Sequence, residues 1–487
     1  MYLGIDIGTS GVKVVLTDED QTVLGTANAP LALSRPKSLW SEQKPDDWWR
    51  ATGAAMAVLR RDHQRAVAAV RGIGLSGQMH GATLLDASDE ELRPAILWND
   101  GRSEAECEAL EKTCPRLRAI TGNPAMPGFT APKLLWVRDH EPDVFGRIRR
   151  VLLPKDYVRL RMTGEAVSDM SDSAGTLWLD VAARDWSDEV LAATDLSRKH
   201  MPRLVEGSAP GGVLRADVAA EWGVPTGIPV AGGAGDNAAG AVGIGTMTPG
   251  RAFLSLGTSG VYFVANGAFS PNPKRAVHAF CHCLPGMWHQ MSVFLSAASC
   301  LTWAADILGA ENEVALLGMI ESGSPGPSDE IFLPYLSGER TPHNDPNAKG
   351  VFFGLTHDSN RAALGRAVLE GVAFAFADGQ DALTGAGAEI DTVSVIGGGS
   401  RSRLWGEILA SVLNRPLTYH AGGEVGPAFG AARLARLAAT GEDPAAVCTP
   451  PPVTRVIEPD PTLADQYAAR LPRFRRLYEK LKDEFRC

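Results

Sequence analysis

The chain of 487 residues is 45% hydrophobic and 21% charged, which excludes an intrinsically disordered protein and predicts two or three globular domains. The formal net charge of −10 argues against a nucleic-acid partner, and no run of about 18 apolar residues predicts a membrane span. Seven cysteines are too few for a disulfide scaffold in a chain of this length, so we expect reduced thiols and a cytoplasmic protein.

The N-terminal segment predicts a strand, a tight loop and a second strand. Residues 2–7 are apolar apart from Asp6, residues 8–11 read Gly-Thr-Ser-Gly, and residues 12–16 are again apolar and β-branched. An aspartate this early in the apolar segment argues against a secretory signal peptide.

The segments that follow alternate between helical and strand patterns. Residues 46–59 carry a helical pattern, and residues 72–75 predict a strand that leads into a loop containing Met79 and His80. Because strands and helices continue to alternate along the chain, the sequence predicts an α/β fold.

An internal repeat organises the chain. The sequence Gly-Thr-Ser-Gly-Val at residues 8–12 recurs at residues 257–261, and each copy lies between two apolar strands. We interpret the repeat as a duplicated domain, with the boundary near residues 245–250. The sequence therefore predicts an N-terminal domain over residues 1–245 and a C-terminal domain over residues 250–445.

The C-terminal segment, residues 446–487, has a different character. Three prolines at residues 450–452 predict a stiff connector. A helix follows, in which Pro472 is expected to introduce a bend. Its predicted apolar face consists of Tyr467, Leu471, Phe474, Leu477 and Leu481.

Glycine-rich turns follow predicted strands at four places, and two of these turns carry hydroxyl side chains. Backbone N–H groups converge at such turns and form a concave site that suits phosphate oxygens. Thr9 and Ser10, with Thr258 and Ser259 in the repeat, therefore predict a phosphate held from two sides. A P-loop is excluded because the sequence has no Gly-Lys dipeptide, and residues 233–238 lack the later acidic residue that a dinucleotide site needs.

Two acidic residues beside glycine turns are candidates for chemistry. Asp6 closes an apolar strand, where a carboxylate is costly to bury without a cation, so it predicts a magnesium site, direct or through water. Asp236 opens a helix of small residues, whose N-terminus favours the ionised form, and an ionised carboxylate can act as a general base. An ordinary capping or turn aspartate is the alternative for each.

Two further groups of residues each have a functional interpretation and a purely structural one. A possible zinc group lacks a second cysteine pair with metal spacing, so buried or edge positions are favoured over a zinc site for His278, Cys281, His282, Cys283 and His289. Trp98 precedes a polar run, and its interpretation stays open between stacking on a sugar and packing in the core.

Several longer motifs resemble the FGGY carbohydrate kinases. Residues 6–13, the repeat at residues 257–260 and residues 397–399 are similar to the phosphate and adenosine motifs of sugar kinases with an actin-like ATPase fold. Residues 128–140 match the first FGGY signature throughout. Residues 350–370 are similar to the second signature and depart from it at one position, Ala363.

This resemblance covers about residues 1–440 and implies two ribonuclease-H-like α/β domains that flank a catalytic cleft. Within the family, residues 78–86, 94–102 and 336–343 resemble the branch that phosphorylates D-xylulose. Glycerol kinases instead carry Arg-Glu at the places of Met79 and His80, so this pair favours a ketose over a small triol.

The resemblance also implies partners and residue roles. ATP and D-xylulose are the implied small-molecule partners, with Mg²⁺ as cofactor, Asp236 as general base and Asp6 positioning the metal and the phosphates. The candidate sugar-binding residues are Met79, His80, Trp98, Asp236 and Asn237, and the candidate nucleotide contacts are Thr9, Ser10, Lys13, Thr258, Gly397, Gly398 and Ser402.

Two rival functions stay open at this point. A sister kinase for another ketose or polyol would share every phosphate motif, and a non-catalytic ATP-binding scaffold would share the fold. We expect no nucleic-acid or membrane partner, and the sequence leaves a homodimer open.

Overall fold

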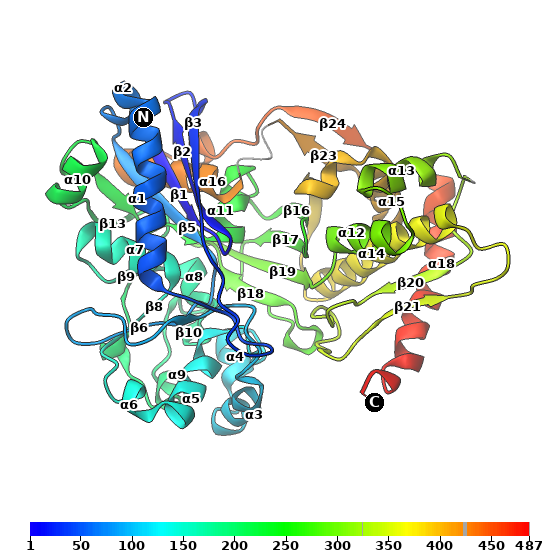
Figure 1. The fold of residues 1–487 in the computed structure, drawn as a ribbon, viewed down its shortest axis with the longest axis horizontal. Coiled ribbons are helices and arrows are strands. Elements are labelled where there is room, and N and C mark those ends of the chain that lie inside the picture. Colours follow the sequence, from blue (N-terminus) through cyan, green and yellow to red (C-terminus); the bar gives the residue numbers. More distant parts are fainter. Residues whose placement is uncertain (324, 422–425, 487) are drawn as a thin grey trace.

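The computed structural model describes residues 1–323, 325–421 and 426–486, which form two α/β lobes, each around a seven-stranded sheet (Figure 1). In the first sheet the strand order is β13-β14-β5-β1-β2-β3, with β15 paired to β5. β1, β2 and β3 form an antiparallel meander, whereas β5 runs parallel to both β1 and β14. The strands are β1 (Tyr2–Ile7), β2 (Gly11–Thr17), β3 (Val23–Pro30), β5 (Gly72–Gly77), β13 (Pro210–Val213), β14 (Pro229–Ala231) and β15 (Ala234–Gly235).

The second sheet repeats this topology. Its strand order is β18-β19-β17-β16-β22-β23-β24, in which β16, β17 and β19 form the meander and β22 and β23 follow in parallel. The shared pairing pattern agrees with our interpretation of the repeated loop as a duplication. The strands are β16 (Gly250–Leu256), β17 (Gly260–Asn266), β18 (His278–Cys281), β19 (Trp288–Phe294), β22 (Ile390–Ile396), β23 (Leu417–His420) and β24 (Val453–Ile457).

The predicted N-terminal elements are confirmed, and none of their ends differs by more than three residues. The predicted strands 2–7 and 12–16 correspond to β1 and β2, and the turn between them closes when Gly8 N donates to Gly11 O at 3.0 Å. The helix predicted over residues 46–59 is α1 (Pro45–Asp62), which has proline at its first position and two aspartates in its first turn.

Helices and short strands complete the first lobe. The short strands pair in twos and position loops around the end of the main sheet. The helices are α2 (Gln64–Val67), α3 (Glu104–Thr113), α4 (Leu117–Thr121), α5 (Thr130–His140), α6 (Pro142–Phe145), α7 (Pro154–Thr163), α8 (Met170–Ala174), α9 (Asp188–Ala193), α10 (Ala216–Trp222) and α11 (Asp236–Gly243). The short strands are β4 (Glu42–Gln43), β6 (Thr83–Leu85), β7 (Ala95–Ile96), β8 (Arg150–Leu152), β9 (Val167–Asp169), β10 (Leu179–Asp180), β11 (Asp185–Trp186) and β12 (Arg203–Val205).

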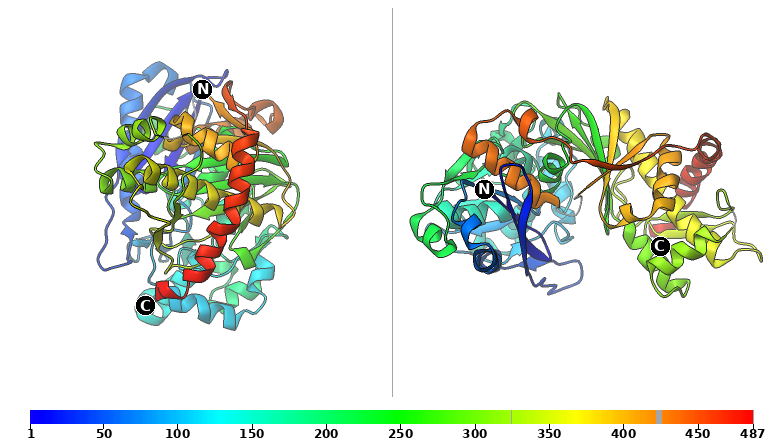
Figure 2. Two further views of the ribbon diagram at one scale, coloured as in Figure 1. Left: turned by 90° about the vertical axis from the view of Figure 1, so that its right-hand side faces the viewer. Right: turned by 90° about the horizontal axis from the view of Figure 1, so that it is seen from above.

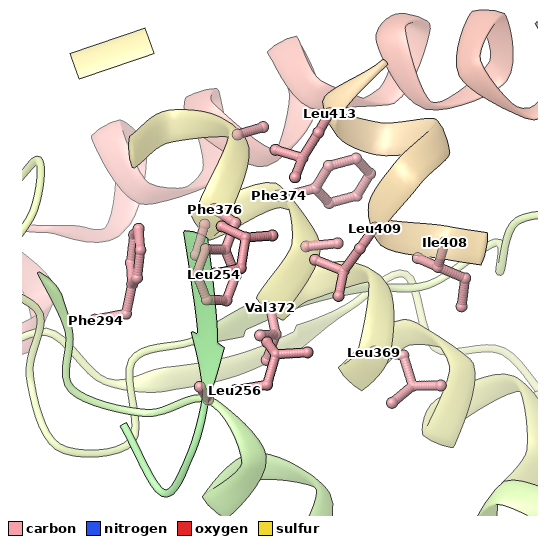
Figure 3. Packing of buried hydrophobic residues seen from close by; sticks show 14 of the residues in the cluster. Leu254, Leu256, Phe294, Leu369, Val372, Phe374, Phe376, Ile408, Leu409 and Leu413 are labelled. Carbon is pink, nitrogen blue, oxygen red and sulfur yellow. The ribbon is translucent and has the colours of Figure 1, made fainter. Parts of the chain in front are cut away.

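The core of the second lobe forms around α14 (Arg361–Thr384), the longest helix that the structure describes. Figure 3 shows Phe374 and Phe376 of α14 beside Leu254 of β16 and Leu409 of the following helix, all of which are buried. The other helices and strands of this lobe are α12 (Ala298–Ile307), α13 (Glu313–Glu321), β20 (Ile331–Pro334), β21 (Gly350–Phe353), α15 (Arg403–Leu413), α17 (Pro444–Val447) and α18 (Pro461–Leu481).

Helix α16 (Gly426–Thr440) joins the two lobes. The sequence places it inside the predicted C-terminal segment 250–445, yet it packs on β1, β5 and α11 of the first lobe (Figures 1 and 2). Glycine permits the close approach: a methyl group on Gly430 would lie 1.8 Å from Ala239 O, and one on Gly4 would lie 1.8 Å from Ala428 O. The chain therefore returns to the first lobe before it ends in the second.

Helix α18 lies on the outer side of the second lobe, as the red helix in Figure 2 shows. It buries Tyr467 and Phe474 of the predicted apolar face and also Tyr478, and it continues through Pro472. Arg475 on this helix pairs with Asp378 of α14. Within the described ranges, no helix combines the length and apolar character that crossing a membrane requires.

Candidate active site

Asp6 and Asp236 are far apart in the sequence, but both lie at the carboxyl ends of strands that pair with β5 in the first sheet. Asp6 is the second-last residue of β1, and β15 leads directly into Asp236 at the start of α11. Both β1 and β15 run parallel to β5, so their carboxyl ends lie together. The negative charge of Asp6 accordingly acts on Asp236 and disfavours its ionised form.

Burial is the main cause of the shifted pKa values of both acids. Burial, with a smaller effect of the Asp6 charge, raises the pKa of Asp236 to about 7, although Asn237 N and Nδ2 donate to its Oδ1 at 2.7 and 2.9 Å. Burial also raises the pKa of Asp6. A hydrogen bond of 2.6 Å from Ser76 Oγ and the charge of Lys13 lower this pKa, but their effect is smaller. A carboxylate with a pKa near neutrality can accept a proton from a hydroxyl group at physiological pH.

A cavity of about 540 Å³ connects Asp236 to the second lobe. Asp236 and Asn237 line it from α11, and Ser255 and Ile396 line it from the ends of β16 and β22. The two strands lead from there into the glycine turns that begin at Gly257 and Gly397. The cavity therefore extends from Asp236 to the side of the second lobe where the predicted nucleotide contacts lie.

The predicted contacts of the second lobe lie at exposed turns and at a helix end. Thr258 is exposed, and its carbonyl oxygen accepts a hydrogen bond from Ser299 Oγ at 2.8 Å. Gly397 and Gly398 are exposed after β22, and Gly397 has a φ of +90°. Ser402 caps α15, because its Oγ accepts from Trp405 N at 3.1 Å.

The first glycine turn is bonded directly to one of the candidate sugar-binding residues, Trp98. Thr9 Oγ1 accepts a hydrogen bond from Trp98 Nε1 at 3.0 Å and donates one to Gln78 Oε1 at 2.9 Å. Its hydroxyl proton is therefore used within the first lobe, whereas Ser10 next to it is exposed. Lys13 lies directly opposite Asp6 in the β1–β2 pair.

His80 has a fixed orientation and a defined tautomer. Its Nδ1 lies 2.6 Å from Gly175 O, and its ring packs edge-on against Phe129 at 4.9 Å between centroids. A carbonyl oxygen can only accept, so Nδ1 carries the proton. Burial, aided by the charge of Lys133, lowers the pKa of His80 to about 3. The neutral ring therefore presents Nε2 as a hydrogen-bond acceptor.

The loop around His80 depends on a lysine whose structural role the sequence analysis missed. Lys133 is fully buried in α5, and its Nζ donates to His80 O and to Gly128 O, both at 2.8 Å. These bonds support His80 at a φ of +69°, where a side chain is seldom found. The feature of the sequence that points to this role is a lysine within an otherwise apolar helical segment. Met79 fills the space beside the loop, against Gly175 and Gly235.

A buried group of charges behind Asp236 was also missed. We define the α7–α8 charge cluster as five side chains that are entirely buried, with Lys155 Nζ bonded to three carboxylates at 2.7 to 2.8 Å. The cluster holds the segment before Asp236, because a cluster arginine donates to Gly232 O and a neighbouring serine accepts from Gly235 N at 3.1 Å. Its members are Lys155, Asp156, Arg159, Asp169 and Asp172, and the serine is Ser171.

The histidine and cysteine residues that raised the question of zinc are buried. His278 stacks on Phe280, and His289 stacks on Phe263. Within the described ranges, no group of three or more histidine, cysteine, aspartate or glutamate side chains is arranged to hold a metal ion.

Family models match both halves of the chain. Residues 1–243 match the N-terminal domain of the FGGY family of carbohydrate kinases, and residues 252–439 match its C-terminal domain. The chain belongs to the FGGY family of carbohydrate kinases. This agrees with the two matching sheets and with the acidic pair beside a cavity between the lobes.

Relatives in the FGGY family extend over almost the whole chain. The xylulose kinases of Escherichia coli (strain K12) and Klebsiella pneumoniae are 56% and 54% identical to it, and each alignment covers 99% of both chains. The crystal structure of xylulose kinase from Rhodospirillum rubrum is 31% identical, with a TM-score of 0.92 and full coverage of both chains. The FGGY chain thus has the actin-like ATPase fold of these sugar kinases.

Proposed function

We propose that the chain transfers the γ-phosphoryl group of ATP to the C5 hydroxyl of D-xylulose. The observation that carries the proposal is the pairing of Asp6 with Asp236, whose pKa is raised to about 7 at the edge of a cavity between the lobes. ATP is the co-substrate of FGGY kinases. The 54–56% identity to two xylulose kinases supports D-xylulose as the acceptor.

Asp236 acts as the general base in this proposal. Its carboxylate takes the proton from the C5 hydroxyl as that oxygen forms a bond to the γ-phosphorus, while the bond from the γ-phosphorus to the bridging oxygen breaks and ADP leaves. In phosphoryl transfer the protein mainly positions the groups and neutralises charge. Asn237 contributes by holding Oδ1 with two hydrogen bonds, which fixes the carboxylate in place.

Asp6 is suited to help hold a magnesium ion, directly or through water. Magnesium in such sites is usually held by one or two carboxylates together with water and substrate phosphates. Asp6 is a buried carboxylate with a raised pKa and a second carboxylate close by, so a cation would offset an existing repulsion. Bound Mg²⁺ would supply neutralisation of the phosphate charge.

The sugar and the nucleotide occupy different sides of the site in this proposal. His80 Nε2 accepts a hydrogen bond from a sugar hydroxyl, Met79 forms an apolar wall, and Trp98 and Asn237 contact the sugar. The nucleotide side is formed by Ser10, Lys13, Thr258, Gly397, Gly398 and Ser402, and Thr9 links the two sides through its bond to Trp98. We place the reaction in the cytoplasm, in keeping with the six cysteines among the described residues, which are buried and unbridged.

A coupled ADP-release assay with a panel of pentuloses, hexuloses and polyols tests the proposal. We expect D-xylulose to have the highest kcat/KM, and ATP turnover without a sugar to be low. A higher kcat/KM for another ketose or a polyol would contradict the assignment of the substrate. Sugar-independent turnover alone would contradict the assignment of a sugar kinase.

A further inference from the structure

A second cavity, of about 840 Å³, lies between the lobes on the side of Trp98. Trp98 and Gly128 line it from the first lobe, and Glu339 and Arg340 line it from the loop between β20 and β21 of the second lobe. Arg340 thus extends from the second lobe toward a wall that contains one of the candidate sugar-binding residues.

The backbone at Arg340 is firmly held. Glu339 exchanges two backbone hydrogen bonds of 2.8 Å with Asp345, and its side-chain Oε1 accepts from Arg340 N at 2.7 Å. Thr341 N donates to Val293 O, and Val293 N donates to Thr341 Oγ1, both at 3.1 Å. The side chain of Arg340 therefore starts from a fixed point on the end of β19.

The guanidinium group of Arg340 has no acceptor of its own. Among the described residues, none accepts a hydrogen bond from it, and no carboxylate lies within ion-pair distance. Arg102 of the first lobe, by contrast, pairs with Asp100 and with Glu42, each at 2.7 Å. Arg340 is half-buried, and the charge of Glu339 offsets only part of the cost of its burial, so the group is suited to a ligand that supplies acceptor oxygens.

The surroundings place Arg340 nearer to His80 than to Asp236. A methyl group on Gly128 would lie 3.6 Å from Arg340 Nη2, and Lys133 bonds the carbonyl groups of both Gly128 and His80. The charge of Arg340 also helps to lower the pKa of His80, whereas the charge that acts on Asp236 is that of Asp6. Arg340 therefore lies on the side of the sugar site away from the reacting hydroxyl.

We propose that Arg340 binds the sugar from the second lobe by donating hydrogen bonds to the oxygens on C1 and C2. This inference rests on the proposed function, because transfer to C5 requires a free C5 hydroxyl and hence the open-chain ketone. In that form the C2 oxygen only accepts hydrogen bonds, and arginine only donates them. His80 Nε2 complements this by accepting a hydrogen bond from a sugar hydroxyl. Arg340 is thus a specificity-determining residue that engages only when both lobes contact the sugar.

The test compares D-xylulose with 1-deoxy-D-xylulose, which lacks the C1 hydroxyl, in the wild type and in Arg340→Met. A hydrogen bond to a charged group contributes about 1.5–3 kcal/mol, so we expect either change alone to lower kcat/KM by about 10- to 100-fold. With the deoxy sugar, Arg340→Met should have a kcat/KM little lower than it has with D-xylulose, because the substitution already removes the contact to C1. The KM for ATP should stay within about twofold.

Two further variants keep the test decisive. Arg340→Lys retains a donor and should recover part of the activity toward D-xylulose even if Arg340→Met is unstable. Lys349→Met removes an exposed positive charge from the same loop and should leave both sugars unaffected. A wild-type kcat/KM in Arg340→Met, fully multiplicative losses, or a raised KM for ATP would each overturn the role of Arg340. A wild type that fails to phosphorylate D-xylulose would instead overturn the proposed function, and with it this inference.

Discussion

Burial acts on Asp236 and His80 in opposite directions because it disfavours the charged form of each. It raises the pKa of the acid to about 7 and lowers the pKa of the histidine to about 3. The acid is therefore able to gain and lose a proton near physiological pH, whereas the histidine stays neutral throughout that range. This difference separates a proton acceptor for the reaction from a fixed hydrogen-bond acceptor for the substrate.

At the scale of single residues, the first prediction concerns the replacement of the proposed base. Asp236→Asn should lower kcat by at least about 100-fold, since removal of a general base costs about 10²–10⁴. Binding of ATP and of the sugar, measured by calorimetry, should persist because the amide has nearly the same shape. A folded variant with near-normal kcat would remove Asp236 from the role of base.

The pH dependence of kcat/KM for the sugar should report the same group. Only ionised Asp236 accepts a proton, so kcat/KM should be constant above a pH of about 7 and fall tenfold per unit below it. Asp6→Asn removes the negative charge that raises this pKa, so it should move the acidic limb to lower pH while it lowers kcat. Rate profiles from pH 5 to 9 measure both, and a flat wild-type profile would contradict the assignment.

The third expected result concerns sugar binding. His80→Ala removes the acceptor Nε2 and should raise the KM for D-xylulose by about tenfold or more, or about 1.4 kcal/mol per decade, with little change in the KM for ATP. Alanine at a φ of +69° is also strained, so a thermal melt should accompany the kinetics. A lower melting temperature with an unchanged sugar KM would show that His80 only stabilises the loop.

At the scale of elements, the α7–α8 charge cluster connects the fold to the proposed base. Three of its members are carboxylates and two are cations, so the cluster would carry a net negative charge if all were ionised. Burial raises the pKa of Asp172, which favours a proton on that residue. Since Arg159 and Ser171 hold the segment from Gly232 to Gly235, the cluster also positions Asp236.

Two substitutions in this cluster should have very different effects on stability. Lys155→Met leaves buried carboxylates without their cation and should lower the free energy of unfolding by about 3–5 kcal/mol. Asp172→Asn replaces a group whose raised pKa favours the protonated form, so near neutral pH it should have a much smaller effect. Urea unfolding of both variants measures the difference, and similar losses would contradict the protonated state of Asp172.

The pH dependence of the Asp172→Asn variant provides a control for that argument. A carboxyl group with a raised pKa in the folded state binds its proton more tightly there than in the unfolded chain. The wild type therefore loses stability as the pH rises above the ordinary value of about 4 toward the folded pKa. The stability of the variant relative to the wild type should rise over the same interval.

At the scale of the whole molecule, α16 determines how the lobes are joined. It belongs to the late part of the chain but packs between β1, β5 and α11, so the contact between α11 and α16 links the first lobe to the segment that returns from the second. The approach is so close that no side chain fits at the crossing.

A matched pair of glycine substitutions tests this contact. Gly430→Ala would place a methyl group 1.8 Å from the backbone oxygen of Ala239, so the helices must separate, and we expect a loss at the upper end of the usual 1–3 kcal/mol for overpacking. Gly240→Ala on the facing helix meets nothing within 4 Å and should be neutral or stabilising by up to about 1 kcal/mol. Equal melting temperatures of the two variants would contradict the packing argument.

The sequence by itself determined the class of fold and the family. Alternating strands and helices predicted an α/β protein, and the exact recurrence of a five-residue loop predicted two related sheets. These features are readable because strand and turn preferences are local properties of the chain. Asp6 and Asp236 each stand out in the sequence as an acid beside a glycine turn, but no local pattern indicates that they interact.

The tertiary structure alone decided which residues share a site. The parallel strands β1, β5 and β15 bring Asp6 and Asp236 together, and the resulting burial shifts their pKa values. Contacts at long range likewise determine that Thr9 bonds to Trp98, that Lys133 supports His80, and that Arg340 reaches the cavity from the other lobe. Burial and solvent exclusion depend on the packing of distant segments, so no local pattern of residues contains them.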